Sequence, residues 1–187
     1  MSKRRRGGGL TGGSGGVNPQ WFQVGITQAI GTAYSEAVVT LPRERLPFGA
    51  RSQVMEILKV EIRPAPTSVL NQTAGTNVSA RIYLTTSSFG TTEPTVQQHG
   101  GKVIATERLD IPSIAASTAD LIWQFPMVED LTDGAGNGVL VATDSIFIGA
   151  IQTAATSPIN GSVMIRCLYR WKNVGLTEYI GIVQSQQ

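Results

Sequence analysis

The amino-acid sequence predicts an all-β fold in which eight strands form a two-sheet antiparallel sandwich behind a flexible basic N-terminal arm. Apolar and polar residues alternate, most clearly at 54–63, where Leu58, Val60 and Ile62 point to one side. Clusters of Gly, Pro, Asn and Ser separate such runs. Several of the connections are too long for hairpins, and long connections indicate crossovers between sheets. A jelly roll fits this pattern better than an up-and-down barrel.

The first element is the arm, which we place at residues 1–20. Lys3, Arg4, Arg5 and Arg6 form an uninterrupted cationic run, and seven of the ten residues at 7–16 are glycine. Glycine has high backbone entropy and no side chain to bury, so this stretch is expected to act as a flexible tether. Residues 21–187 are expected to form a single jelly-roll domain.

The eight strands are expected at about 33–40, 54–63, 79–86, 102–109, 121–127, 138–143, 146–152 and 162–172. These runs are rich in Val, Ile, Thr and aromatic residues, which favour strands. The long connections lie at about 41–53, 64–78, 87–101 and 110–120. No segment shows a sustained 3.6-residue period, and only 112–121 is expected to form a short helix, with Ser113 as its cap.

The charge is distributed unevenly along the chain. Residues 1–16 carry four of the fifteen Lys and Arg and no Asp or Glu, so the remainder has a net charge of 11 − 13 = −2. A polyanionic partner is therefore expected to be bound mainly through the arm. No apolar run approaches the roughly 18 residues that would cross a bilayer, so no membrane partner is expected.

A second group of cations lies in the last expected strand. Arg166, Arg170 and Lys172 share one face of residues 162–172, so they could bind phosphate or pair with acidic residues on neighbouring strands. Trp21 and Phe22 follow the arm and could stack on bases or anchor the arm to the core.

Residues for catalysis are sparse. His99 is the only histidine in the sequence. Cys167 is expected on the same side of its strand as the apolar residues, which favours a buried, structural thiol. The loop at 129–138 gathers acidic residues among glycines without the spacing of an EF-hand, so a solvated turn is favoured over a calcium site. We therefore expect no enzyme activity, no metal and no cofactor.

The C-terminal stretch 144–187 resembles the end of the small capsid proteins of circular, replication-initiator-encoding single-stranded DNA viruses. The segment RCLYRWKNVGLTEYIGIVQSQ carries most of the likeness. The resemblance implies a coat protein that self-assembles, in about sixty copies, into an icosahedral virion shell around circular single-stranded DNA. It implies genome binding by Lys3 and Arg4 to Arg6, and the same residues could serve as a signal for host nuclear import before assembly. Members of this group often carry longer arginine-rich arms.

Other functions remain open at this point. The coat protein of a small satellite-type RNA virus would have the same fold and a similar arm. A jelly-roll carbohydrate-binding module would need exposed aromatic residues, which make up only 6% of this chain. A single-strand-binding protein outside a capsid would need a basic groove on its body.

Overall fold

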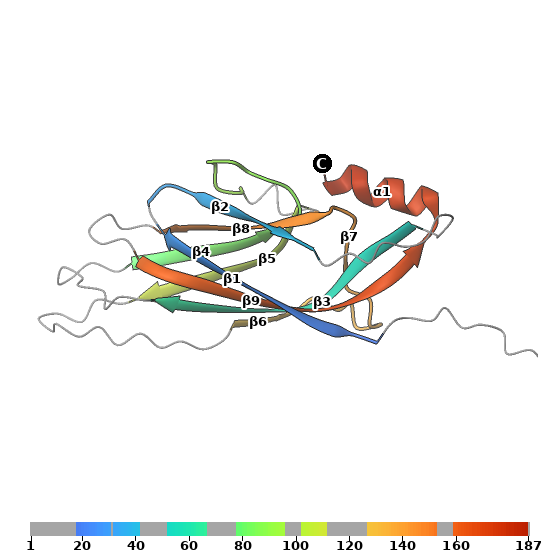
Figure 1. Ribbon diagram of the computed structural model, residues 1–187, viewed down its shortest axis with the longest axis horizontal. Coiled ribbons are helices and arrows are strands. Elements are labelled where there is room, and N and C mark those ends of the chain that lie inside the picture. The colour runs from blue at the N-terminus through green and yellow to red at the C-terminus, as the bar shows by residue number, and fades with distance from the viewer. Residues whose placement is uncertain are drawn as a thin grey trace, which may run out of the picture.

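A computed structural model describes residues 18–30, 32–41, 52–66, 78–95, 102–111, 127–152 and 159–186. Two antiparallel sheets are stacked face to face in this part of the chain, and one helix lies at one end of the stack (Figure 1). The predicted all-β sandwich is confirmed. The predicted helix at 112–121 lies outside the described residues, as does the predicted strand at 121–127 apart from Met127.

The first sheet contains β1 (Gln20–Ile30), β9 (Ile159–Val174), β3 (Ser52–Pro66) and β6 (Met127–Asp130), in that order. A fifth strand, β7 (Val139–Val141), also pairs with β3. β6 pairs with the segment 59–62 of β3 and β7 with the segment 55–57. The two short strands therefore occupy successive parts of one edge position.

The second sheet runs in the order β2 (Ser35–Thr40), β8 (Ser145–Gln152), β4 (Val78–Thr85) and β5 (Val103–Ile111). Strands that follow one another in the chain mostly lie in different sheets or apart in one sheet, as crossover connections require. With β6 and β7 sharing a position, each sheet has four strand positions, which is the jelly-roll arrangement.

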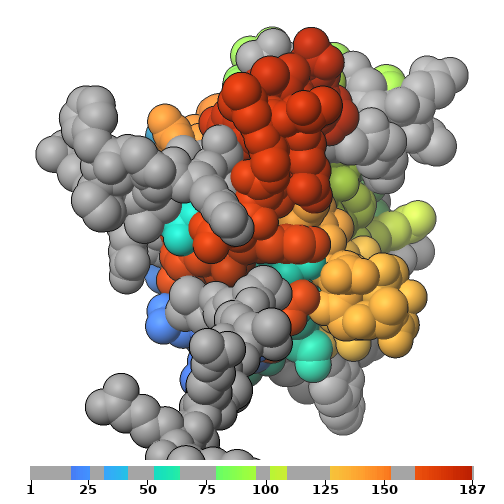
Figure 2. All heavy atoms as spheres, turned by 90° about the vertical axis from the view of Figure 1, so that its right-hand side faces the viewer, coloured from blue at the N-terminus to red at the C-terminus, as the bar shows by residue number. Residues whose placement is uncertain are grey.

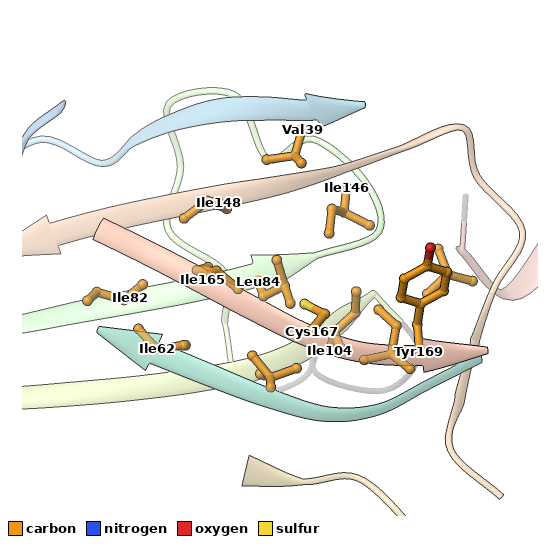
Figure 3. Close-up of a cluster of buried hydrophobic side chains, with 14 of the residues drawn as sticks. Val39, Ile62, Ile82, Leu84, Ile104, Ile146, Ile148, Ile165, Cys167 and Tyr169 are labelled. Atoms are coloured by element: carbon orange, nitrogen blue, oxygen red, sulfur yellow. The ribbon is translucent and has the colours of Figure 1, made fainter. Parts of the chain in front are cut away.

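The core lies between the two sheets. Alternate residues of the strands point inward, except where the register shift between Ile57 and Lys59 interrupts the alternation in β3. The strands of the first sheet contribute Ile62, Ile165 and Cys167 (Figure 3). β2, β4 and β8 supply Val39, Ile82 and the neighbouring aliphatic side chains from the opposite side. The predicted burial of Cys167 is confirmed, and this burial raises the pKa of its thiol to about 12, so the sulfur is held as an inert thiol.

Strand β1 was not among the predicted strands. It begins at Gln20 and pairs along its whole length with β9. Phe22 and Val24 pack against the core, and the ring of Phe22 lies edge-on to that of Tyr169, with 5.5 Å between centroids. The anchoring role considered for Phe22 is therefore confirmed, and the aromatic residue is part of a strand.

The C-terminal helix α1 (Leu176–Gln186) corrects the expectation that no segment has a helical period. Tyr179, Ile182 and Val183 project from one side of it and pack on a small cluster formed by Val54, Ala142 and Val174. The side chain of Gln186 accepts a hydrogen bond from the backbone N–H of Ala142 (3.0 Å) and donates one to the carbonyl of Leu140. These contacts attach the helix to the outer side of the first sheet.

The segment 86–95 folds beside the outer side of the second sheet. The Glu36 carboxylate of β2 accepts hydrogen bonds from the hydroxyl of Ser88 and the backbone N–H groups of Phe89 and Gly90. Glu93 forms an ion pair with Arg81 at 2.8 Å. Acidic side chains thus hold this segment to the strands.

Candidate nucleic-acid interface

The three cations predicted in the last strand lie on the outer face of the first sheet. Inward residues of β9, such as Ile165 and Cys167, belong to the core, so Arg166, Arg170 and Lys172 project to the opposite side. Each retains an exposed side-chain fraction of 31 to 38%. We call this surface the β9 face, defined by the outward residues of β1, β9, β3 and β6.

The centre of the β9 face contains a buried carboxylate, Glu56 of β3, whose side chain has no exposed area. It accepts a hydrogen bond from the guanidinium of Arg170 and another from the backbone N–H of Gly138, at 3.1 Å. The ammonium of Lys172 lies 3.7 Å from the same carboxylate. Arg170 also donates to the carbonyl of Gly136, at 2.9 Å. One acid therefore holds two cations and a turn.

Burial by itself would raise the pKa of Glu56, but the net shift is downward. The hydrogen bonds from Arg170 and Gly138 and the charges of Arg170 and Lys172 outweigh the desolvation. Helix α1 and the 131–138 turn lie beside this end of β9 (Figure 2) and help to exclude water from it. The Glu56 carboxylate is thus ionised and paired at neutral pH.

A second group lies further along β9, around Arg166. Its guanidinium contacts Glu61 of β3 at 3.2 Å and lies over the indole of Trp21, 4.7 Å from the ring centroid. Glu61 also pairs with Arg63 at 3.3 Å. Trp21 is 42% exposed, so the outer side of this cation–aromatic pair is open to solvent. A flat aromatic ring beside a guanidinium is able to stack a nucleobase and contact its phosphate.

Arg166, Arg170 and Lys172 were expected either to bind phosphate or to pair with acids on neighbouring strands. Cross-strand pairing occurs, as Glu56 and Glu61 show, but the pairing does not neutralise the face. Among the described outward residues there are five cations (Lys59, Arg63, Arg166, Arg170 and Lys172) and three acids (Glu56, Glu61 and Asp130), a net charge of 5 − 3 = +2. The whole body, by contrast, is slightly acidic.

The N-terminal arm joins the fold beside this surface. Gln20, the first residue of β1, pairs with Tyr169 of β9, so the chain enters the sheet next to Arg170. Asn18 and Pro19, the preceding described residues, are exposed. Lys3, Arg4, Arg5 and Arg6 lie outside the described residues, and so does His99. The strand register places Gln20, the first residue of β1, at the edge of the β9 face.

Of the acidic loop predicted at 129–138, the part at 131–138 is a turn, whereas Glu129 and Asp130 lie in β6 and Glu129 points inward. The carboxylates of Asp130 and Asp133 are satisfied within this segment. Asp133 accepts hydrogen bonds from the backbone N–H groups of Ala135 and Asn137, and Asp130 accepts them from Thr132. These bonds lower the pKa values of both carboxyl groups. Gly134 and Gly136 adopt positive φ angles of 81° and 84°, which only glycine adopts without strain.

Within the described ranges, no group of three or more His, Cys, Asp or Glu side chains could hold a metal ion. No helix in this part of the chain is long and apolar enough to cross a membrane. The features that the described residues do offer are a charged sheet face and an aromatic–cation pair.

No protein-family model matches the chain, and no curated protein matches it. Among solved structures, the chain is similar to the VP1 protein of Human Polyomavirus 12 in complex with 3'-sialyllactosamine, at 9% identity and a TM-score of 0.52, covering 84% of this chain and 100% of that one. It is also similar to the Human Polyomavirus 6 VP1 pentamer, at 10% identity and a TM-score of 0.53, covering 84% and 97%.

A third similar structure is VP1 of the trichodysplasia spinulosa-associated polyomavirus in complex with 6'-sialyllactose. The identity is 8%, the TM-score 0.53, and the coverage 89% of this chain and 98% of that one. At these identities the likeness shows a shared jelly-roll fold.

Proposed function

We propose that the chain is a viral capsid subunit that assembles with copies of itself into a closed shell around a nucleic acid. The observation that carries this proposal is the combination of a jelly roll with one net-positive sheet face at the edge where a cationic arm enters. The VP1 structures with the same fold belong to capsid proteins, which supports a structural and not an enzymatic role.

We infer that the cargo is circular single-stranded DNA. This step rests on the resemblance of residues 144–187 to the coat proteins of single-stranded DNA viruses. Unpaired bases can stack on Trp21 beside Arg166, whereas bases inside a duplex are not available for stacking. The contacts of the arm would be to phosphates and therefore independent of sequence. The coat protein of a satellite-type RNA virus is the second candidate, because stacking and phosphate contacts also suit single-stranded RNA.

In this proposal the arm has two successive uses. Lys3 and Arg4 to Arg6 would bind host nuclear import machinery before assembly and phosphates of the genome afterwards. The finished location of the protein would be the virion. A carbohydrate-binding module fits less well, because the exposed aromatic residue of the β9 face is paired with a cation and lies among charges.

The proposal predicts that the purified full-length chain forms closed particles of on the order of sixty subunits or a multiple of that number. Sedimentation velocity and negative-stain electron microscopy over a range of salt concentrations measure this. Nuclease typing of the contents separates DNA from RNA. A chain that stays monomeric under all of these conditions contradicts the capsid role, and RNA alone in the particles favours the satellite-type alternative.

A further inference from the structure

The side of the sandwich where β5 and β6 form the two sheet edges carries two inward carboxylates. Glu129 of β6 pairs in register with Val60, and Glu107 of β5 pairs with Ile82; both partners are core residues. Residues that are paired across a sheet point to the same face, so both acids point into the space between the sheets. They approach from opposite sheets and each raises the electrostatic cost of the other's charge.

Glu129 is only partly satisfied. Its carboxylate accepts a hydrogen bond from the backbone N–H of Thr106, which ties β6 to the facing edge of β5 across the gap between the sheets. The Oε2 atom of the same carboxylate is buried and has no hydrogen-bond partner in the described part of the chain. A buried carboxylate oxygen without a donor is costly while the group is ionised and much less costly once the group is protonated.

Among the residues that the structure describes on the neighbouring strands, no cation points toward the two acids. The inward neighbours on β3 and β4 are aliphatic, as Val60 and Ile82 show. The other charged residues described on these strands lie on the outer faces: Glu56, Lys59, Glu61, Arg63 and Asp130 on the first sheet, and Arg81 and Arg108 on the second. Burial and then the charge of Glu129 raise the pKa of Glu107, and burial raises that of Glu129.

We propose that Glu107 and Glu129 form a pH-sensitive pair that weakens the β5/β6 side of the sandwich near neutral pH and lets it tighten in mild acid, when the pair takes up a proton. Protonation removes the repulsion between the sheets and gives Glu129 an O–H that can donate. The pair would therefore stabilise the folded chain on acidification. This inference does not depend on the proposed capsid function.

The contribution of the pair to stability increases as the pH falls, because proton binding is linked to folding. Both groups bind protons more tightly in the folded state than in the unfolded state, where the ordinary value is 4.5. Their contribution to stability is therefore greatest below that value and declines as the pH rises through the folded-state pKa values. Glu56 contributes with the opposite sign, because its pKa is lowered. The effect of the pair must consequently be isolated by substitution.

The test compares the pH dependence of unfolding for the full-length chain with that of Glu129→Gln and Glu107→Gln, and Glu178→Gln on the exposed side of α1 serves as the matched control. Glutamine keeps an oxygen that can accept from Thr106 but carries no charge. We expect Glu129→Gln to increase the folding equilibrium constant about tenfold at about pH 8, because it removes a charge whose buried Oε2 atom has no donor. At about pH 4.5 the constant should change little, because protonation has already removed most of that charge.

Hydrogen exchange in the unsubstituted chain provides a second readout that does not depend on whether the variants fold. After correction for the intrinsic rate, peptides of β5 and β6 should be more protected at about pH 5 than at about pH 8, whereas peptides of β2 and β8 should not change in this way. The proposal is overturned if Glu129→Gln destabilises the chain equally at both pH values, or if protection of β5 and β6 does not increase in acid.

Discussion

Replacing Arg170 with alanine should reduce the free energy of unfolding by about 2–4 kcal/mol, because it leaves the buried Glu56 carboxylate without its closest partner. Arg170 also donates to Gly136 in the 131–138 turn, so the substitution loosens both contacts. Lys172 remains 3.7 Å from Glu56 and limits the loss. Thermal unfolding at neutral pH should show a midpoint lowered by about 5–15 °C.

The matched control is Arg63→Ala, which removes another arginine from the same sheet face. Arg63 is 46% exposed in its pair with Glu61, and exposed pairs contribute at most about 1 kcal/mol. Adding Glu56→Gln to Arg170→Ala should recover part of the stability, since the buried charge is then gone. If Arg170→Ala costs no more than Arg63→Ala, the Glu56 cluster does not stabilise the fold in the way described.

The same cluster predicts a dependence on pH. The pKa of Glu56 is lowered in the folded state, so its contribution is complete above its ordinary value of 4.5 and is lost as the pH falls through the folded-state pKa. The stability difference between the unsubstituted chain and Arg170→Ala should therefore shrink in strong acid. A difference that persists unchanged there would assign the loss to packing of the arginine side chain instead.

Neutralising the arm by changing Lys3, Arg4, Arg5 and Arg6 to glutamine should weaken binding of single-stranded DNA strongly at low salt. Up to four phosphate contacts per subunit disappear, and each contributes about 0.7 to the slope of log affinity against log salt. The slope should therefore fall by up to about 2.8. Fluorescence anisotropy with a labelled oligonucleotide over a series of salt concentrations measures the slope directly.

The shell should still form without the arm cations, because the core and the sheets are made by residues outside the arm. About sixty subunits with four arm cations each supply about 240 positive charges, so a genome much longer than about 240 nucleotides needs further cations. Arg166 on the β9 face should contribute to that remainder. Arg166→Ala should lower the slope further, whereas Arg81→Ala on the other sheet should not. If the slope of log affinity against log salt is unchanged after the arm is neutralised, the arm does not contact the genome.

Most strands could be predicted because apolar and polar residues alternate in a strand that has one buried face. Val60, Lys59 and Ile62 of β3 show this alternation. The strand β1 carries the same signal in Phe22 and Val24, but its closeness to the glycine-rich arm concealed it. The helix α1 was missed because Ile180, Ile182 and Val183 favour strands, and Gly181 weakens helices. Its spacing of Tyr179, Ile182, Val183 and Gln186 was the available signal.

The candidate site was predictable only in part. Arg166, Arg170 and Lys172 could be assigned to one face, because alternate residues of a single strand point to the same side. Their partners Glu56 and Glu61 depend on the register between β3 and β9, which includes a shift between Ile57 and Lys59 and connects residues more than a hundred positions apart. No local pattern specifies such a register.

In the proposed capsid, the β9 face and the first residues of β1 would line the inside of the shell and meet the nucleic acid there. Cryo-electron microscopy of the assembled full-length particles tests it most directly, because the map shows which sheet face of each subunit points inward. We expect Arg166, Arg170 and Gln20 to line the interior, with additional density next to Trp21. A shell in which this face lies on the outer surface, with the arm leaving toward solvent, would contradict it.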